Sequence, residues 1–560
     1  MLTFPEFKPT FPKESWVLPR VLEHQAKTIG DRPFLKWDDN GPEYTFAETN
    51  RKANQLAHGL QKAGLVKGDC AVLFMPNSLE YLLSCYALNK IGAIEVPINT
   101  AYKGSFLEHQ VNISKAQTII ADLELLPAVQ GSIERMPTVA RIVIWTRDGK
   151  LPAQLPTVGN CKVLSFQSLY SSDDSNPGIK VLPQDIGAIM FTSGTTGLSK
   201  GVMMPHAHLV LWGVTYGPAV RMTAQDRLYV CTPLFHMSAL GMQVIGALIA
   251  GASVYCVERF SPTRWIEEVR SSAATIAGLV GVLGELIYRT PAKADDGANS
   301  LRTVFSAAIP EELAIGFARR FGVDLVQGYG QTECNMVTYS GRDDPLTIGC
   351  TGRPLDRYFE VRIVDPDTDE PLAAGALGEI VVRPKKPGCF MQGYYRMPEK
   401  AAEAWRNLWL HTGDAGRFDS AGRLFFVDRI KDRIRRRGEN ISAFEIEEVL
   451  SRFSPIEECA AVGIRVEGAG GEDEIKACVV AKEGATIDRV ALLDFCVARM
   501  PRYAVPRFIE ILAELPKTAS GKVQRQELRN RGLSDTTWDR ETIQYTIPRD
   551  SAQQPRTSLP

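Results

Sequence analysis

The sequence predicts an α/β protein with at least two domains, and three observations lead to this. Apolar runs typical of strands alternate with helical stretches through the first 350 residues, as in parallel sheets covered by helices. Residues 351–428 instead contain short strands separated by Pro, Gly and Asp turns. A chain of 560 residues is also too long for one hydrophobic core.

The first block is expected to supply parallel strands and their covering helices. The expected strands are Ala71–Phe74, Ile91–Val96, Thr118–Ala121, Ile142–Trp145, Ile186–Phe191, Ser253–Val257 and Thr303–Ser306. The expected helices are Ser15–Ile29, Thr45–Ala63, Ser78–Ile91 and Pro310–Phe321. Together they make an N-terminal domain, residues 1–430.

Within this domain, residues 351–428 are expected to form an antiparallel, β-barrel-like subdomain. Its strands are Val361–Val364, Gly378–Val382 and Leu424–Val427. The charged segment Asp428–Arg437 then leads into a smaller unit of helices and strands, residues 431–529. The tail, residues 530–560, is polar with little periodicity, so we expect it to be loose or to depend on a partner.

Composition narrows the class of protein. Apolar residues make up 44% and charged residues 23%, typical of a soluble globular protein, and the formal net charge is −1. This charge argues against nucleic acid or an anionic membrane as the main partner. The 11 cysteines form no C-x-x-C pair, which favours reduced thiols in the cytoplasm over a disulfide framework or a zinc site. The first residues contain no apolar segment typical of a secretory signal.

One uncharged run, Leu228–Val257, is long enough to span a bilayer. Pro233, His236 and Gln243 interrupt it, and β-branched residues gather at its end. We therefore predict a strand, a loop, a buried helix and a second strand there, and no membrane span.

Residues 191–202 carry the strongest functional signal. Glycines at 194, 197 and 201 let the backbone turn tightly, and the hydroxyls of Ser193, Thr195, Thr196 and Ser199 and the charge of Lys200 lie among them in the sequence. Such a loop after an apolar strand is typical of polyphosphate binding, although it matches neither the Walker A nor the dinucleotide pattern. A flexible surface loop is the alternative interpretation.

Further motifs follow this loop in a fixed order. They are Pro233–His236, Gly328–Glu333, Trp409–Asp414, Asp428–Asp432, Arg437–Ser442, Glu445–Glu447 and Leu515–Lys522. The ordered set, spanning roughly residues 15–528, resembles the adenylate-forming superfamily of acyl-CoA synthetases, adenylation domains and luciferases. Phrases such as Phe-Val-Asp-Arg and Gly-Glu-Asn-Ile-Ser are most similar to those of carnitine/crotonobetaine-type CoA ligases.

The resemblance implies a reaction in two halves: a carboxylate and ATP give acyl-AMP and diphosphate, and CoA then displaces AMP. It implies Mg²⁺ as cofactor, held by Glu333 with Thr195, and a contact of Thr332 with the α-phosphate. The residues implied in ATP and AMP binding are Thr192, Ser193, Gly194, Thr195, Thr196, Gly197, Lys200, Gly328, Tyr329, Gly330, Asp414 and Arg429. Tyr329 offers a flat face to adenine, and Asp414 is the acceptor type that suits ribose hydroxyls.

The resemblance also implies a mobile C-terminal domain and an N-terminal domain with two stacked sheets. Lys522 matches the catalytic lysine of the last motif and Lys431 the hinge. CoA binding is expected at Arg437, Gly438 and Glu439. A homodimer is compatible with this interpretation.

The expected acyl pocket is lined by His236, Ala239, Met242, Ser306, Ala307 and Ala308. The resemblance adds Gly328–Thr332 to this lining, and the only carboxylate in or beside these stretches is Glu333, which does not suit an acid with a quaternary ammonium group. A medium-chain, aromatic or polycyclic acid fits as well.

Alternatives remain at this point. The chain could load a carrier protein instead of CoA, act as a luciferase-like oxygenase, or bind nucleotide without catalysis. His206 and His208 could suggest a metal site, but two ligands on a strand-like stretch without a third are a weak signal. Six basic residues in Arg429–Arg437 could suggest nucleic acid, but no aromatic residues separate them.

Overall fold

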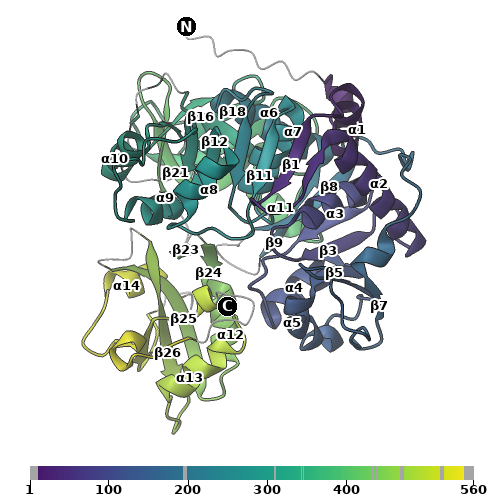
Figure 1. Cartoon of the computed structure of the whole chain (residues 1–560). Helices are drawn as coiled ribbons and strands as arrows, with labels where there is room; N and C mark the ends of the chain where they lie inside the picture. The colour runs from purple at the N-terminus through teal and green to yellow at the C-terminus, as the bar shows by residue number, and fades with distance from the viewer. Residues whose placement is uncertain are drawn as a thin grey trace.

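The chain folds into two lobes, and in Figure 1 the smaller one lies at the lower left while the larger one fills the top and the right. The computed structural model describes residues 11–192, 199–307, 311–341, 344, 346–347, 349–429, 433–436, 439–466, 472–516 and 523–547. The larger lobe comprises residues 11–429, and the smaller lobe comprises residues 433–547.

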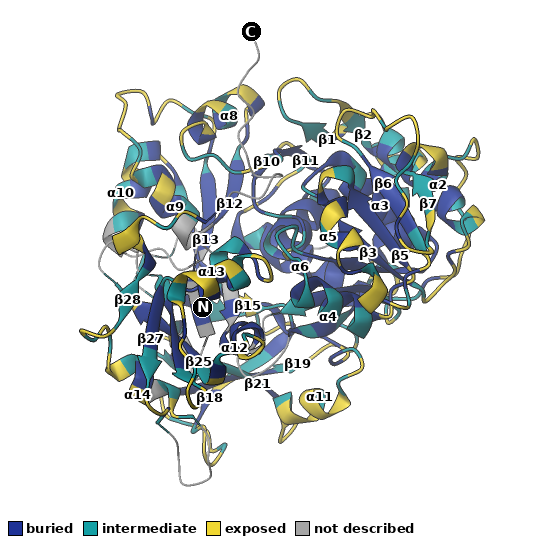
Figure 2. Cartoon of the chain, turned by 90° about the horizontal axis from the view of Figure 1, so that it is seen from below, coloured by how far each residue is buried: buried dark blue, intermediate teal, exposed yellow. Residues whose placement is uncertain are grey.

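The first sheet of the larger lobe is mostly parallel, as the alternating pattern predicts. Its strand order is β7-β6-β5-β3-β4-β8-β9, and only β8 and β9 pair antiparallel. The strands are β7 (Lys162–Ser165), β6 (Arg141–Trp145), β5 (Thr118–Asp122), β3 (Cys70–Phe74), β4 (Ile94–Pro97), β8 (Ile186–Thr192) and β9 (Lys200–Pro205). Strands β3, β5 and β6 are almost wholly buried (Figure 2).

The second sheet has the order β14-β13-β12-β10-β11-β1-β2 and is parallel except for the β1–β2 pair. Its strands are β14 (Asp324–Val326), β13 (Thr303–Ala307), β12 (Ile276–Val280), β10 (Arg227–Val230), β11 (Ser253–Cys256), β1 (Pro33–Trp37) and β2 (Glu43–Thr45). Strand β10 has β11 on one side and β12 on the other.

Helices separate and cover the two sheets, and side-chain alternation along the strands shows the layers. In β3, Leu73 packs in the central core shared by both sheets, whereas Phe74 packs in the outer core of the first sheet. Tyr229 of β10 packs in the outer core of the second sheet. The two stacked sheets are therefore as expected.

The helices of this lobe are α1 (Leu18–Thr28), α2 (Phe46–Lys62), α3 (Leu79–Lys90), α4 (Ser105–Ser114), α5 (Leu126–Gln130), α6 (His206–Ala219), a π-helix (Ser238–Ile245), α7 (Gly246–Ala250), α8 (Trp265–Ser272), α9 (Gly281–Tyr288), α10 (Glu311–Phe321) and α11 (Pro398–Ala404).

The uncharged run Leu228–Val257 forms a strand, a loop, buried helical turns and a second strand, as predicted. Among the described residues, no helix is both long and apolar enough to cross a membrane.

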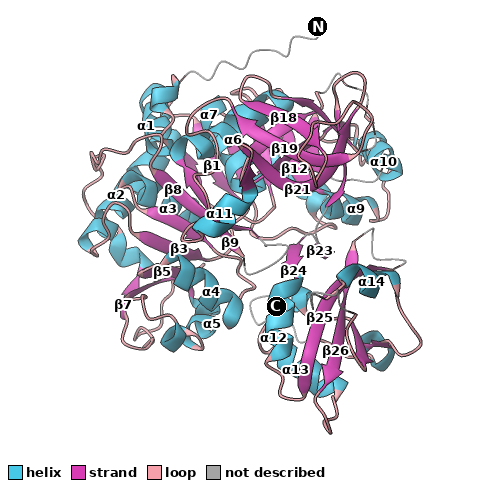
Figure 3. Cartoon of the chain, turned by 180° about the vertical axis from the view of Figure 1, so that it is seen from behind, coloured by secondary structure: helices cyan, strands magenta, loops and turns pink. Residues whose placement is uncertain are grey.

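The antiparallel subdomain is an open sheet, and not the barrel-like form that we expected. Its order is β15-β16-β17-β22-β21-β19-β18, with β20 on β21, and in the described residues no pairing joins β15 to β18. Strand β15 begins two residues after β14, the edge strand of the second sheet, ends, so the antiparallel sheet follows directly on the second sheet in the chain. The strands, several of which lie side by side in Figure 3, are β15 (Gly328–Gln331), β16 (Asn335–Tyr339), β17 (Cys350–Pro354), β18 (Phe359–Val364), β19 (Gly378–Pro384), β20 (Trp405–Arg406), β21 (Trp409–Phe418) and β22 (Leu424–Arg429).

The smaller lobe has its own hydrophobic core and mixes helices with short sheets. Its elements are β23 (Arg433–Arg436), β24 (Glu439–Ser442), α12 (Ala443–Ser451), β25 (Ile456–Arg465), β26 (Asp473–Ala481), α13 (Arg489–Val497), β27 (Phe508–Leu512), α14 (Arg525–Asn530) and β28 (Trp538–Asp539). The main sheet has the order β25-β26-β27-β28.

Part of the segment expected to be a loose tail is packed on this lobe. Strand β28 pairs with β27, and Arg540 is buried and donates to the carbonyl groups of Val505 and Pro506 at 3.2 and 3.0 Å. Arg507 and Asp539 form an ion pair at 2.9 Å. The polar composition of residues 530–560 led us to expect a loose tail, but these charged side chains are paired within the smaller lobe.

Candidate active site

The hairpin of β15 and β16 places Thr332 and Glu333. Gln331 and Asn335 are Cα partners, so the three residues between them form the turn. Asn335 is buried at a φ of 75°, a left-handed conformation that Asn tolerates better than most residues. Its amide donates to the His208 carbonyl at 3.0 Å, and its side-chain oxygen accepts from Thr215 at 3.0 Å. The turn is thereby fixed to α6.

The glycines of this hairpin are required by close backbone approaches. A Cβ at Gly330 would lie 2.2 Å from the carbonyl oxygen of Asn335, and one at Gly328 would lie 2.9 Å from that of Thr338. Only glycine fits at these two positions without moving the backbone of β16.

Glu333 lies between the two ends of the phosphate-loop motif. The carboxylate is 8% exposed, and its Oε1 accepts from the Thr192 hydroxyl at 3.3 Å and from the Tyr394 hydroxyl at 3.0 Å. Lys200 Nζ donates to the Tyr394 hydroxyl at 3.2 Å and lies 4.3 Å from the centre of its ring. The structure therefore brings Thr192, Lys200 and Glu333 together, as the motifs predict, and adds Tyr394.

A second group of side chains joins β15 to β21. The Tyr329 hydroxyl donates to Asp414 Oδ2 at 2.8 Å, and the Gln331 amide donates to the same oxygen at 2.6 Å. Burial and the neighbouring Asp414 charge raise the pKa of Tyr329 well above its usual range, so the hydroxyl stays protonated. The Tyr329 ring stacks on Phe426, with the centroids 5.9 Å apart and the planes 24° apart.

The expected acyl residues lie on and just before the π-helix that follows β10, and on β13. Ala239 and Met242 are buried on the π-helix, and His236 is exposed just before it. Ser306 is buried on β13, and its hydroxyl has no hydrogen-bond partner among the described residues.

Several expected site residues lie outside the described residues. These are Ser193, Gly194, Thr195, Thr196, Gly197, Ala308, Lys431, Arg437, Gly438 and Lys522. For Ala307, Arg429 and Glu439 only the backbone is described; Arg429 is the Cα partner of Asp414 in the β21–β22 pair.

The smaller lobe touches the end of the phosphate-loop motif. The backbone N–H of Ser199 donates to Glu445 Oε1 of α12 at 3.1 Å. His109 of α4 lies 2.8 Å from the Ser199 carbonyl oxygen, and Gln110 donates to its hydroxyl at 3.2 Å. Both lobes therefore hold the residue just before β9.

His206 and His208 start α6, and do not lie on a strand as their sequence suggested. Burial lowers the pKa of each to about 4, so both are neutral near pH 7. His208 Nε2 lies 2.9 Å from the Thr332 carbonyl oxygen. Across the described part of the chain, no group of three or more His, Cys, Asp or Glu side chains could hold a metal ion.

The sequence did not single out Tyr394, Gln331 or Phe426 for the site. Gln331 lies inside a recognised motif, so its amide could have been included. Tyr394 follows Gly393 in a loop and contacts β9 through a bridge to Val202 and through Lys200, and no pattern in its neighbourhood indicates these contacts.

Comparisons with known proteins agree with this geometry. The family model described as AMP-binding enzyme matches residues 22–395, and that of the AMP-binding enzyme C-terminal domain matches residues 445–522. A feruloyl-CoA synthase from Amycolatopsis sp. is 32% identical over 88% of this chain and 94% of its own. A crotonobetaine/carnitine–CoA ligase from Salmonella agona is 30% identical over 87% of this chain and 93% of its own.

Among solved structures, an anthranilate CoA ligase in complex with anthranoyl-AMP has a TM-score of 0.67 at 26% identity, covering 93% of this chain and 98% of that one. Family matches, ordered motifs and site geometry thus agree. The chain belongs to the AMP-binding enzyme family and is an AMP-forming acyl-CoA synthetase of the adenylate-forming superfamily, an acid–thiol ligase that forms acyl-CoA from ATP through an acyl adenylate.

Proposed function

We propose that this acyl-CoA synthetase acts on an acid with an uncharged aromatic or medium-chain apolar body. The observation that carries this is the chemistry of the acyl side, where Ala239 and Met242 are buried and apolar. The nearest carboxylate in the motifs, Glu333, already accepts two hydrogen bonds. An acid with a quaternary ammonium group would lack a counter-charge there.

The named relatives support this choice in part. One is a feruloyl-CoA synthase and one solved neighbour holds anthranoyl-AMP, and both names describe aromatic acids. The carnitine ligases act on a charged acid and are almost as similar in sequence. The lining of the acyl side is therefore the reason to prefer the aromatic or apolar class.

Glu333 and Thr192 are the residues that we propose to hold Mg²⁺, together with Thr195 of the loop. The chemistry of the donors fits, because Mg²⁺ takes hard oxygen ligands and usually needs one or two protein groups beside phosphates and waters. A carboxylate and a hydroxyl 3.3 Å apart at the end of β8 supply that kind of donor set. When bound, the metal would neutralise charge on the phosphates.

The nucleotide is expected to lie between the two groups of side chains. Lys200 and the loop residues Ser193–Gly197 would bind the β- and γ-phosphates, with Thr332 at the α-phosphate. Asp414 would accept from the ribose hydroxyls while Tyr329 and Gln331 keep the carboxylate oriented. Gly328 and Gly330 let the hairpin backbone approach adenine, and Arg429 would support ribose or phosphate.

Attack of a carboxylate on the α-phosphate brings two anions together, so neutralising charge and positioning dominate the barrier. Lys522 is proposed as the cation that spans both groups, delivered by the C-terminal domain. We propose domain boundaries at residues 430 and 529, with Lys431 as the hinge and Arg437, Gly438 and Glu439 at CoA. His236 is proposed as the residue between the acyl group and the thiol.

The experiment is a panel of acids assayed for diphosphate release, followed by mass spectrometry of the product with CoA. Aromatic or medium-chain acids should be the best substrates, and carnitine and crotonobetaine should be poor. The proposal fails if a quaternary ammonium acid is the best substrate. A product found only on an added carrier protein would support the carrier-loading alternative.

The cytoplasmic location and the homodimer remain predictions. All 11 cysteines lie in the described part of the chain and are free thiols, which supports a reducing compartment.

A further inference from the structure

Two buried side-chain amides hold the segment that leads to His236. The first is Asn77, which is 6% exposed and follows β3. Its Nδ2 donates to the carbonyl groups of Thr232 and Val257 at 3.0 and 3.2 Å, and its Oδ1 accepts from the backbone N–H of Leu234 at 2.8 Å. Because Thr232 follows β10 and Val257 follows β11, Asn77 ties together the carboxyl ends of two strands.

The second amide is Gln243 of the π-helix, which is 1% exposed. Its Nε2 donates to the Thr232 hydroxyl at 3.3 Å and to the Ser238 carbonyl at 3.1 Å. Its Oε1 accepts from the backbone N–H of Gly278 in β12 at 3.2 Å.

Gln243 occupies the place where β10 and β12 separate. Their pairing ends at Tyr229 and Ala277, although β12 continues to pair with β13 up to Val280. A Cβ at Gly278 would lie 2.7 Å from Gln243 Cδ, so only glycine leaves room for the amide. The next residues along β10 are thereby linked to β11 by Asn77 and to β12 by Gln243.

The two amides lie at a position in the sheet where ligands commonly bind. The chain runs from β10 to β11 on one side and then returns to β12 on the other, so the strand order reverses at β10. In open α/β sheets, ligands bind outside the carboxyl ends of strands at such a reversal. His236 leaves the sheet at this point and precedes the π-helix that carries Ala239 and Met242.

We propose that Asn77 and Gln243 are positioning residues that fix His236 and the first turn of the π-helix as one wall of the acyl site, and so set which acids the enzyme accepts. This rests on the proposed function, in which these residues face the acyl group. Each amide uses both of its N–H groups and its oxygen, so its orientation is fully determined. A carboxylate in its place would put a negative oxygen against carbonyl or hydroxyl oxygens.

The test uses three variants. Gln243→Glu and Gly278→Ala change the two sides of the contact between Gln243 and Gly278, and Asn77→Asp changes the other amide. Thr232→Val, which removes one acceptor only, serves as the mildest change. Diphosphate release is measured as kcat and KM for ATP and for two acids: the best substrate of the panel and a smaller analogue. Using whichever acid the panel selects keeps this test valid even if the proposed acid class is wrong.

We expect the variants to change the kinetic constants for the acid and to leave those for ATP unchanged. KM for the better acid should rise by about 10–10²-fold, the range for a wall displaced by about 1 Å, while KM for ATP stays unchanged. The ratio of kcat/KM between the two acids should shift in the same direction in every variant.

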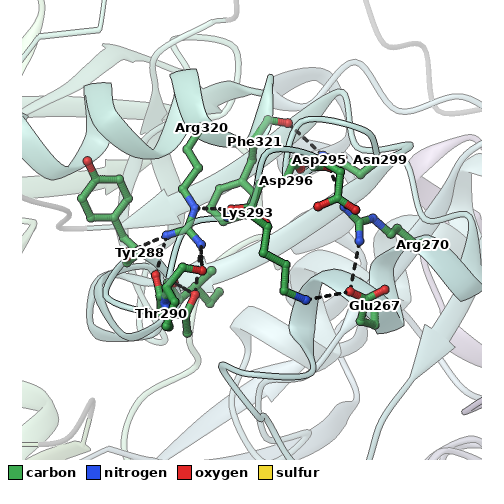
Figure 4. Close-up of polar contacts among 12 residues, drawn as sticks. Glu267, Arg270, Tyr288, Thr290, Lys293, Asp295, Asp296, Asn299, Arg320 and Phe321 are labelled. Carbon is green, nitrogen blue, oxygen red and sulfur yellow. Dashed lines mark hydrogen bonds and ion pairs between the residues drawn. The ribbon is translucent and has the colours of Figure 1, made fainter.

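Asn299, which lies in the segment before β13, provides a matched control (Figure 4). Its Nδ2 donates to the carbonyl groups of Asp296 and Phe321, each at 2.9 Å, and its Oδ1 accepts from the Leu301 N–H at 2.9 Å. Asn299→Asp should therefore lower the melting temperature and leave the ratio between the acids unchanged. The inference is wrong if the variants raise KM for the acid and KM for ATP equally. It is also wrong if Asn299→Asp shifts the kcat/KM ratio between the two acids as Gln243→Glu does.

Discussion

Tyr394 links the phosphate-binding lysine to the expected metal ligand, and Tyr394→Phe tests this link. The hydroxyl accepts from Lys200 at 3.2 Å and donates to Glu333 at 3.0 Å, and the residue is 4% exposed. The substitution removes both hydrogen bonds and keeps the ring, including its contact with the Lys200 ammonium group. Glu333 and Lys200 should then be less well oriented toward Mg²⁺ and phosphate.

The size of the effect follows from the number and kind of bonds. A hydrogen bond to a charged group contributes about 1.5–3 kcal/mol. The two bonds share one hydroxyl, and water can replace part of each, so we expect a loss equivalent to one bond. At about 1.4 kcal/mol for each factor of ten, adenylation should slow by about 10–10²-fold.

The assay is diphosphate release at increasing Mg²⁺ concentration, compared with conversion of preformed acyl-AMP and CoA to thioester. Tyr394→Phe should need more Mg²⁺ and slow only the first half-reaction. Tyr395→Phe is the control, because that neighbouring hydroxyl lies beside Cys70. Equal Mg²⁺ dependence and equal rates in the two variants would refute the link.

Three further predictions follow from the same site. Asp414→Asn weakens the acceptor that Tyr329 and Gln331 orient, so KM for ATP should rise by about 10-fold or more in steady-state kinetics while KM for the acid is unchanged. Lys522→Ala should lower acyl-AMP formation by about 10²–10³-fold and leave thioester formation from supplied acyl-AMP intact, and equal loss in both would reject its assignment. The pKa of His208 is lowered from 6.5 to about 4, so its contribution to stability is complete above pH 6.5 and is lost as the pH falls toward 4. At about 1.4 kcal/mol for each unit, urea unfolding of His208→Gln should depend less on pH in this range than that of the native protein.

The sequence predicted the parallel sheets well because buried strands are marked by local apolar runs. Six of the seven expected strands of the first block coincide within a residue with β3, β5, β6, β8, β11 and β13. One differs: the run from Ile91 begins as a strand only at Ile94, because Ile91 ends α3 and Gly92 turns the chain with a φ of 70°.

What the sequence could not predict depends on contacts between distant segments. Tyr394 reaches Glu333 across 61 positions of the chain, and nothing near either residue indicates that contact. The packed end of the chain is similar: a polar segment gives no apolar pattern, yet Trp538 and Ile547 join the core of the smaller lobe. Strand pairing at the edge of a sheet also follows from three-dimensional neighbours, which is why a barrel-like form was expected where the sheet is open.

The described residues at the two ends of the phosphate-loop motif are held from three directions, and this explains why its motif alone was a strong but incomplete signal. Thr192 and Lys200 are Cα partners at one end of the β8–β9 pair, so the first sheet fixes both of these residues. Glu333 and Tyr394 contact both ends of the loop from the larger lobe's other segments, and Glu445 holds Ser199 from the smaller lobe. A loop held at both ends by separate parts of the fold can position phosphate only when those parts are in place. If the motif binds the phosphates as proposed, ATP binding should respond to the contact between Ser199 and Glu445 of the smaller lobe.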